Sequence, residues 1–217
     1  MKKYTAIAAA ILMCLTLVGC TSKADRYTNY IRATLECSYY GIETDYAEAI
    51  GITNDEALDL YRDEVAYVTE LICYRFAVEP SCISAETQEG YELLAMDVLE
   101  KTKFTVDKAV KSGDSYHVTV HCEPIDFWDI AYEDVEKFYV DEFGVKYEAA
   151  SSQEELDKLE EEYAVRVLEI ITPYVDKIGY GEPVKKIVEI TVDEDGKEGI
   201  TDEEWLAIDD LILGKQS

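Results

Sequence analysis

Residues 103–122, KFTVDKAVKSGDSYHVTVHC, decide between an all-helical fold and a fold that contains a sheet. Apolar side chains recur at every second position on both sides of a short turn at 111–115: Phe104, Val106 and Val110 before it, and Val118, Val120 and Cys122 after it. A period of two is typical of strands with one buried face, and turn residues between two such runs indicate a hairpin. This stretch therefore predicts a β-hairpin.

On both sides of the hairpin, apolar residues recur at every third or fourth position, which is typical of amphipathic helices. Before the hairpin we predict helices over 26–40, near 45–50, from 54 to near Pro80, and from 85 to about 100. After it we predict helices over 126–143 and from 153 to Pro173, a third strand over 184–192, and a last helix containing Trp205. Without the short turn of helix near 45–50, the order is ααα-ββ-αα-β-α. This order predicts an α+β domain in which helices pack on a small, mainly antiparallel three-stranded sheet.

Several helix boundaries are marked by residues that cap free backbone groups. In a capping box, a Ser or Thr side chain and the acidic side chain three residues later each accept a hydrogen bond from the other residue's backbone N–H. Three pairs match this pattern: Thr53 with Glu56, Ser152 with Glu155, and Thr201 with Glu204. Ser84 can cap the helix that follows it, and Gly41 is a typical stop for the first helix.

The first twenty residues match the signal peptide of a bacterial lipoprotein. Lys2 and Lys3 precede an uncharged, mostly apolar run over 4–15, which is too short to cross about 30 Å of hydrocarbon as a permanent helix. Leu17-Val18-Gly19-Cys20 then resembles the lipobox, in which small residues fit the lipoprotein signal peptidase and the cysteine thiol receives diacylglycerol. Acyl chains such as palmitate would hold the protein at the bilayer.

These patterns divide the precursor into three parts. We predict a signal peptide over 1–19, with cleavage between Gly19 and Cys20. A lipidated Cys20 and a short tether over 20–25 would follow, and then a single globular domain over 26–217. The expected location is extracytoplasmic, with the membrane as the partner of the lipid anchor.

The charge of the chain excludes one class of partner. Removal of Lys2 and Lys3 with the signal peptide takes the formal charge from -27 to -29. So acidic a domain repels phosphate backbones, and nucleic acid is therefore not an expected partner. Acidity of this kind serves solubility, or alternatively the capture of cations or basic peptides. Hydrophobic residues make up 48% of the chain, enough for a folded core.

Four cysteines remain in the mature chain besides Cys20: Cys37, Cys73, Cys82 and Cys122. An oxidising location permits disulfides, and four cysteines allow three pairings that the sequence does not separate. Cys73 with Cys82 closes the shortest loop. The alternative is that the four thiols are free and pack as small apolar groups.

Three polar groupings contain residue types that occur in binding or catalytic sites. His117 and His121 lie four residues apart on one strand, about 13 Å at roughly 3.3 Å per residue, too far to bind one zinc ion together. Asp193-Glu194-Asp195-Gly196 does not match the ligand register of a calcium loop and is better explained as an acidic turn. Asp126, Trp128, Asp129 and Tyr132 place acids beside aromatic rings, as sugar sites do, but the start of an amphipathic helix, with its acids near the positive end of the helix dipole, explains them better. We therefore assign no catalytic residue, metal site or cofactor.

The lipobox, the Thr53 capping box, the hairpin that ends in His121-Cys122-Glu123-Pro124, and the final strand, acidic turn and Trp205 helix together resemble a group of surface lipoproteins of gut-dwelling Firmicutes. Families of this kind are described as domains of unknown function. The resemblance implies a Gram-positive cell surface and transfers no catalytic residues.

From these observations we expect a non-catalytic, membrane-tethered module that binds a surface ligand or protein. One alternative is a protein that captures a small molecule or a cationic peptide in a pocket between sheet and helices. The other is a hydrolase that uses two carboxylates facing each other across a cleft.

The lipobox assignment makes a direct prediction. Cys20→Ala should leave uncleaved precursor in pulse-labelled cells, because the variant lacks the thiol that receives diacylglycerol. Electrophoresis of radiolabelled protein measures the ratio of precursor to mature chain. Processing of the variant at the wild-type rate would refute the lipobox.

Overall fold

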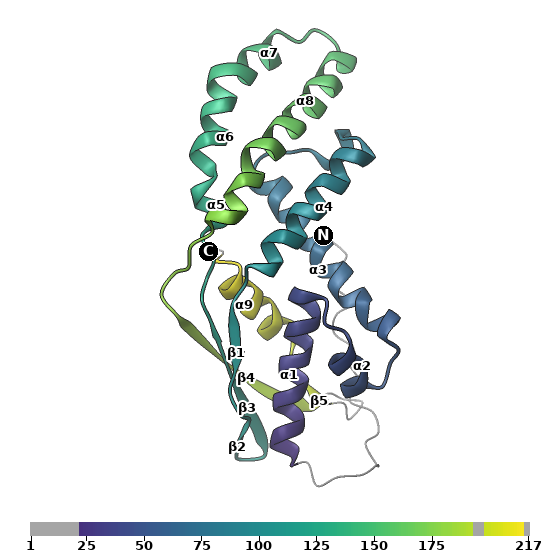
Figure 1. Cartoon of the computed structure of the whole chain (residues 1–217), viewed down its shortest axis with the longest axis vertical. Helices are drawn as coiled ribbons and strands as arrows, with labels where there is room; N and C mark the ends of the chain where they lie inside the picture. The colour runs from purple at the N-terminus through teal and green to yellow at the C-terminus, as the bar shows by residue number, and fades with distance from the viewer. Residues whose placement is uncertain (1–21, 193–197, 215–217) are drawn as a thin grey trace. The chain divides into compact units, whose positions relative to one another are not determined.

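Figure 1 shows the protein as a computed structural model that describes residues 22–192 and 198–214. The predicted signal peptide, Gly19, Cys20 and the acidic turn at 193–196 lie outside these ranges. No helix among the described residues has both the length and the apolar character needed to cross a membrane.

The contacts of the chain divide it into two compact units, and a single globular domain over 26–217 stays a prediction. The first unit is made of three stretches of the chain: the described residues up to Glu64, then Thr102–Pro124, and then the described residues from Gly181 onward. The second unit is made of two stretches, Val65–Lys101 and Ile125–Tyr180. The chain passes between the units within helix α3 (Asn54–Arg75).

The first unit is built on an antiparallel sheet whose central strand is β3 (Ser115–Cys122). One edge of β3 pairs with β1 (Phe104–Val106) and β2 (Val110–Ser112), and the other edge pairs with β4 (Val184–Val192). The short strand β5 (Glu198–Gly199) extends the sheet beside the end of β4. Within the described residues the sheet therefore has five strands, and the prediction of three was wrong, although the α+β class is confirmed.

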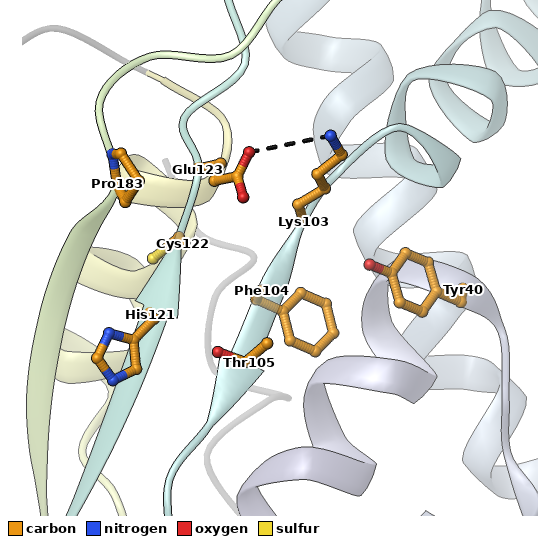
Figure 2. Close-up of a pocket in the computed structure, with 8 residues that line it drawn as sticks. All are labelled: Tyr40, Lys103, Phe104, Thr105, His121, Cys122, Glu123 and Pro183. Carbon is orange, nitrogen blue, oxygen red and sulfur yellow. Dashed lines mark ion pairs between the residues drawn. The ribbon is translucent and has the colours of Figure 1, made fainter.

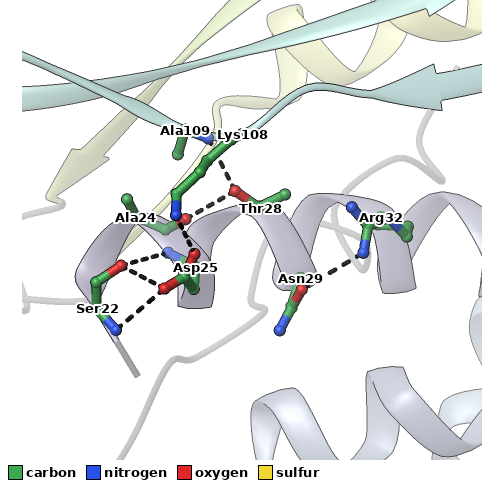
Figure 3. A network of polar contacts seen from close by, with 8 residues as sticks. All are labelled: Ser22, Ala24, Asp25, Thr28, Asn29, Arg32, Lys108 and Ala109. Atoms are coloured by element: carbon green, nitrogen blue, oxygen red, sulfur yellow. Dashed lines mark hydrogen bonds and ion pairs between the residues drawn. The ribbon is translucent and has the colours of Figure 1, made fainter. Parts of the chain in front are cut away.

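The predicted first strand is split into β1 and β2 by a contact with helix α1 (Lys23–Tyr40). The Ala109 N–H donates to Thr28 Oγ1 (2.8 Å), and Lys108 Nζ lies 2.7 Å from the Asp25 carboxylate. Figure 3 shows how these bonds draw the connection between the two strands onto the first turn of α1. Sequence periodicity did not reveal the split because its cause is a residue some eighty positions away.

One face of this sheet is buried and the other is open. Val118, Val120 and Cys122 of β3 are at most 2% exposed and lie beneath α1 and α9 (Asp202–Ile212), whereas the alternate residues are partly exposed. Between these two helices the Tyr39 hydroxyl donates to the carboxylate of Asp209, and both side chains are buried. Burial and the neighbouring Asp209 charge hold the pKa of Tyr39 well above its usual range, so the hydroxyl keeps its proton.

The second unit consists of helices that pack through hydrogen bonds as well as apolar contacts. Its main helices are the C-terminal part of α3, α4 (Ala85–Glu100) and α8 (Gln153–Ile171). The buried Tyr91 hydroxyl of α4 donates to the Ala164 carbonyl (2.8 Å), and the Tyr163 hydroxyl donates to the Phe76 carbonyl (2.9 Å). Short 3₁₀ segments η1 (Pro80–Cys82) and η3 (Thr172–Lys177) follow α3 and α8, so α8 ends before Pro173 as predicted.

The helix predicted over 126–143 is instead a series of shorter segments: α5 (Phe127–Ile130), α6 (Tyr132–Phe138), the π-helical turn η2 (Tyr139–Phe143) and α7 (Gly144–Ala149). Gly144 does not end the helix, because its N–H donates to the Tyr139 carbonyl five residues back. The wider turn places Phe138 and Phe143, five residues apart, against the same ring of Tyr163, at centroid distances of 6.0 and 4.6 Å. Aromatic packing thus accounts for the π-helical turn.

The capping signals read from the sequence are present in the structure. Thr53 and Glu56 form the predicted capping box at α3, Thr201 and Glu204 form another at α9, and Gly41 ends α1 with a φ of 65°. At α8, Ser152 caps as predicted, but the Glu155 carboxylate binds the Ser151 N–H instead. The short helix α2 (Thr44–Ile50) also forms where the sequence predicted one.

The N-terminus of α4 is capped by a carboxylate from another helix. Glu161 of α8 accepts hydrogen bonds from the Ser84 N–H (2.7 Å), the Ser84 hydroxyl (2.8 Å) and the Thr87 hydroxyl (2.7 Å). Partial burial acts to raise the pKa of Glu161, but these hydrogen bonds outweigh it, and the pKa lies below its usual range. The ionised carboxylate therefore stabilises the folded second unit.

We predict that Glu161→Gln lowers the stability at pH 7 by about 1–2 kcal/mol, because the neutral amide loses the charge-assisted bonds to Ser84 and Thr87. Because the folded-state pKa is lowered, the stabilisation is present above the unfolded-state pKa and is lost as pH falls through the folded-state value. Urea unfolding from pH 7 to pH 3 should show wild type and variant converging at the acidic end. Glu162→Gln on the same helix, which removes an exposed partner of Lys146, should change stability by less than about 0.5 kcal/mol. Equal effects of the two variants would contradict the role of Glu161.

Candidate functional site

A cleft of about 350 Å³ opens in the first unit where the end of α1 meets β1 and the end of β3 (Figure 2). Its size is at the lower end of the range for small-molecule sites. Its lining residues come from four segments of the chain: Tyr40, Lys103, Phe104, Thr105, His121, Cys122, Glu123 and Pro183.

Aromatic rings form one wall of the cleft. Figure 2 shows the Phe104 ring turned toward Tyr40, and the two rings stack with centroids 5.3 Å apart and an interplanar angle of 11°. The Tyr40 hydroxyl donates to the Thr102 carbonyl (2.8 Å), which fixes the tilt of its ring. Tyr40 is the last residue of α1, and Gly41 then turns the chain away in the left-handed conformation. The stop at Gly41 thus places an aromatic side chain at the cleft.

Opposite charges lie beside this wall. Lys103 Nζ is 3.9 Å from Glu123 Oε2, and both side chains are about half exposed. Their backbones are joined as well, since the Glu123 N–H donates to the Lys103 carbonyl (3.1 Å) just beyond the paired residues of β1 and β3. The cleft therefore presents a cation and an anion side by side.

His121 belongs to the cleft, but His117 does not. His121 Nε2 lies 2.8 Å from Asp107 Oδ2, and His121 pairs across the sheet with Thr105 and Lys185. His117 pairs instead with Val110 and Glu189, toward the other end of β3. The structure keeps the two histidines apart, as their spacing predicted, and no group of three or more potential metal-ligating side chains is found within the described ranges.

Cys122 is the strongest nucleophile by residue type in the cleft, but its surroundings make it unreactive. The side chain is 2% exposed, and burial raises the pKa of the thiol to about 11. A thiol with such a pKa is almost entirely protonated at neutral pH, and the thiolate is the reactive form. The arrangement thus favours non-covalent binding through aromatic and charged groups.

The acidic and aromatic cluster considered from the sequence has a structural role in the second unit. Trp128 is 8% exposed, and Arg75 lies over the Tyr132 ring at 4.5 Å and pairs with Asp129 at 3.4 Å. Asp126 accepts the Gly179 N–H (2.7 Å). Since these groups contact one another, they do not form an open sugar-binding surface.

The four thiols are free in the structure. Cys37, Cys73 and Cys122 are buried, and burial raises the pKa of each to about 11, whereas Cys82 is partly exposed. This arrangement corresponds to the free-thiol alternative, and a Cys73–Cys82 disulfide in the native protein stays a prediction.

The sequence did not identify Tyr40, Lys103 or Phe104 as site residues. Tyr40 stands directly before a helix-stopping glycine, and Lys103 and Phe104 stand at the start of β1, but neither local pattern indicates that the two segments meet. The part of the cleft that the sequence did single out is the end of the hairpin, His121-Cys122-Glu123.

No protein-family model matches this chain, and no curated protein is significantly similar to it in sequence. Among solved structures, the chain is similar to YcdA of Bacillus subtilis, a protein provisionally described as a lipoprotein. The two are 11% identical with a TM-score of 0.55, and the match covers 86% of this chain but 56% of the YcdA chain. At this identity the likeness shows a shared fold, and membership of a family of domains of unknown function stays a prediction.

The thiol environments predict a single reactive cysteine. The test uses the folded protein truncated to begin at Ser22, which lacks Cys14 and Cys20. In this protein Cys82 should react with Ellman's reagent at pH 8 at least about a hundred-fold faster than the three buried thiols. Absorbance at 412 nm should report one fast equivalent, with four after unfolding, and none fast in Cys82→Ser. No fast equivalent in the wild-type chain, together with a mass lower by two hydrogens, would instead establish a disulfide such as Cys73–Cys82.

Proposed function

We propose that this protein is a lipid-anchored, extracytoplasmic binding protein without catalytic activity. The charged N-terminus, apolar run and Leu17-Val18-Gly19-Cys20 support the anchor, and the fold shared with a provisionally described lipoprotein supports the same location. The cleft of the first unit is the binding site that we propose.

Helix α1 would hold a lipid anchor on Cys20 away from the cleft. Helix α1 begins at Lys23, three residues after Cys20, and ends at Tyr40 in the cleft wall. Its 18 residues span about 27 Å at 1.5 Å per residue. The polar network in Figure 3 ties the first turn of this helix to the β1–β2 connection, so the start of α1 is fixed to the sheet. Acyl chains on Cys20 would therefore insert at the end of α1 opposite to the cleft.

The lining of the cleft favours a small zwitterionic ligand with a planar apolar part. The apolar part would pack on Phe104 and Tyr40, while a carboxylate binds Lys103 and an ammonium group binds Glu123. When such a ligand binds, its carboxylate and its ammonium group replace the Lys103–Glu123 ion pair with two ion pairs, so each of the two side chains still has a partner of opposite charge. The single observation that carries this proposal is that an aromatic pair and a Lys–Glu ion pair line the same cleft.

A hydrolase that uses two carboxylates is less well supported. Such an enzyme needs two acids facing each other across its cleft. Glu123 is the one carboxylate among the described lining residues, and it pairs with Lys103.

We predict that free L-tryptophan or L-phenylalanine binds the cleft, and that N-acetyl-L-phenylalanine amide, which lacks both charges, binds at least about five-fold more weakly. Saturation-transfer NMR and calorimetric titration of the mature domain measure binding. Lys103→Met and Glu123→Gln should each weaken the affinity by about five-fold, because each removes one charged contact that is partly exposed.

A matched variant separates the cleft from general charge effects. Lys101→Met removes a cation two residues from Lys103, in the second unit, where it pairs with Asp176. The affinity of this variant for L-tryptophan or L-phenylalanine should equal that of the wild-type protein. Equal affinities for the zwitterion and its uncharged derivative, or equal effects of Lys101→Met and Lys103→Met, would overturn the proposed site.

A further inference from the structure

The second unit exposes apolar side chains at η2 and α7. Val140 is 65% exposed, Val145 is 70% exposed and Tyr139 is 45% exposed. Val140 and Val145 lie five residues apart across the turn in which hydrogen bonds span five residues, so they project from neighbouring positions on one side. We call Tyr139, Val140 and Val145 the η2 face. Exposed apolar side chains that lie together are typical of interaction sites.

The surroundings of the η2 face are strongly acidic. From Tyr132 to Ile171 the sequence contains 13 acidic and four basic residues, a formal charge of -9. Among them, Glu136 lies one helical turn before Val140, and Asp141 and Glu142 follow it directly. This field attracts cations and repels anionic proteins and lipid headgroups.

A cavity of about 300 Å³ lies along the same α6–η2 segment and is lined by Asp134, Lys137, Phe138, Asp141, Glu142 and Ile170. Asp134 accepts a hydrogen bond from the Tyr174 hydroxyl. Asp141 and Glu142 form no ion pair with any residue in the described part of the chain, and Lys137 is the one cation in the lining. Phe138 and Ile170 supply apolar side chains to the same lining. Carboxylates above apolar surface can hold the charged end and the aliphatic stem of a Lys or Arg side chain.

We propose that the η2 face and this cavity dock a cationic, amphipathic segment of a partner protein. Apolar side chains of the segment pack on Val140 and Val145, and one of its Lys or Arg side chains enters the cavity beside Asp141 and Glu142. Complementary charge favours this occupant over an acidic segment, which the same carboxylates would repel. The site lies within the second unit and is independent of both the lipid anchor and the cleft of the first unit.

The probe for this proposal is a synthetic 14-residue peptide of leucine and lysine at helical spacing, with a leucine and glutamate peptide of the same pattern as its control. The chain from residue 20 to Ser217, produced without its signal peptide and therefore without lipid, is titrated by calorimetry. We expect the lysine peptide alone to bind, and its affinity to fall as salt rises.

The sharpest test compares variants that remove a negative charge from the cavity with a variant that removes a positive charge from it. Asp141→Asn and Glu142→Gln should each weaken binding by about three-fold, and Lys137→Gln should strengthen it by about three-fold, because the lysine opposes the incoming cation. Val140→Ser should also weaken binding, without lowering the melting temperature, since its side chain is largely exposed.

Two acids on α2 of the first unit serve as matched controls. Asp45→Asn and Glu48→Gln remove the same charge from exposed positions elsewhere, and should leave the affinity unchanged. No binding of the lysine peptide would overturn the proposal. Equal weakening by the α2 variants and by the cavity variants would also overturn it, because it would show attraction to net charge alone.

Discussion

The antiparallel pairing of β3 with β4 determines most of the first unit. Seven residue pairs, from Tyr116 with Ile190 to Cys122 with Val184, set the register. A slip of one residue would turn Val118 and Val120 to solvent and bury His117 and His121 under α1 and α9. On the other edge of β3, the pairing with β1 places Cys122 opposite Phe104, and so brings Glu123 next to Lys103 at the cleft. The candidate site is thus a consequence of which face of β3 is apolar.

The helices that cover this sheet are specified by a buried polar contact as well as by apolar packing. Asp209 is 2% exposed, and burial of a carboxylate costs free energy unless hydrogen bonds replace those it made with water. The Tyr39 hydroxyl supplies one such bond, and it can do so only when α1 and α9 lie in this arrangement. An alternative packing of the two helices would leave the carboxylate without this donor. The contact therefore favours one arrangement among several of similar apolar burial.

Local signals predicted the helices well, and tertiary contacts account for the differences. Capping at Thr53, Ser84 and Thr201 depends on residues within one turn, which the sequence displays directly. The split between β1 and β2 depends on Thr28, and the π-helical turn depends on Tyr163, both distant in sequence. Strand β5 has only two residues, too few to show a period. The sequence also did not reveal the cleft, because the cleft forms where four segments that are distant in sequence meet.

The acidity of the chain separates into two groups of carboxylates with different roles. Several accept backbone N–H groups at helix N-termini, including Asp25, Glu56, Glu155 and Glu161, and these hydrogen bonds help to lower the pKa of each. Such acids serve the fold, because they satisfy amides that have no partner within the helix. Asp141 and Glu142 differ, since they lie within a continuous run of helical turns and line a cavity beside exposed valines. A carboxylate that neither caps a helix nor pairs with a cation adds repulsion to an already acidic unit, and the proposed cationic partner would offset that cost.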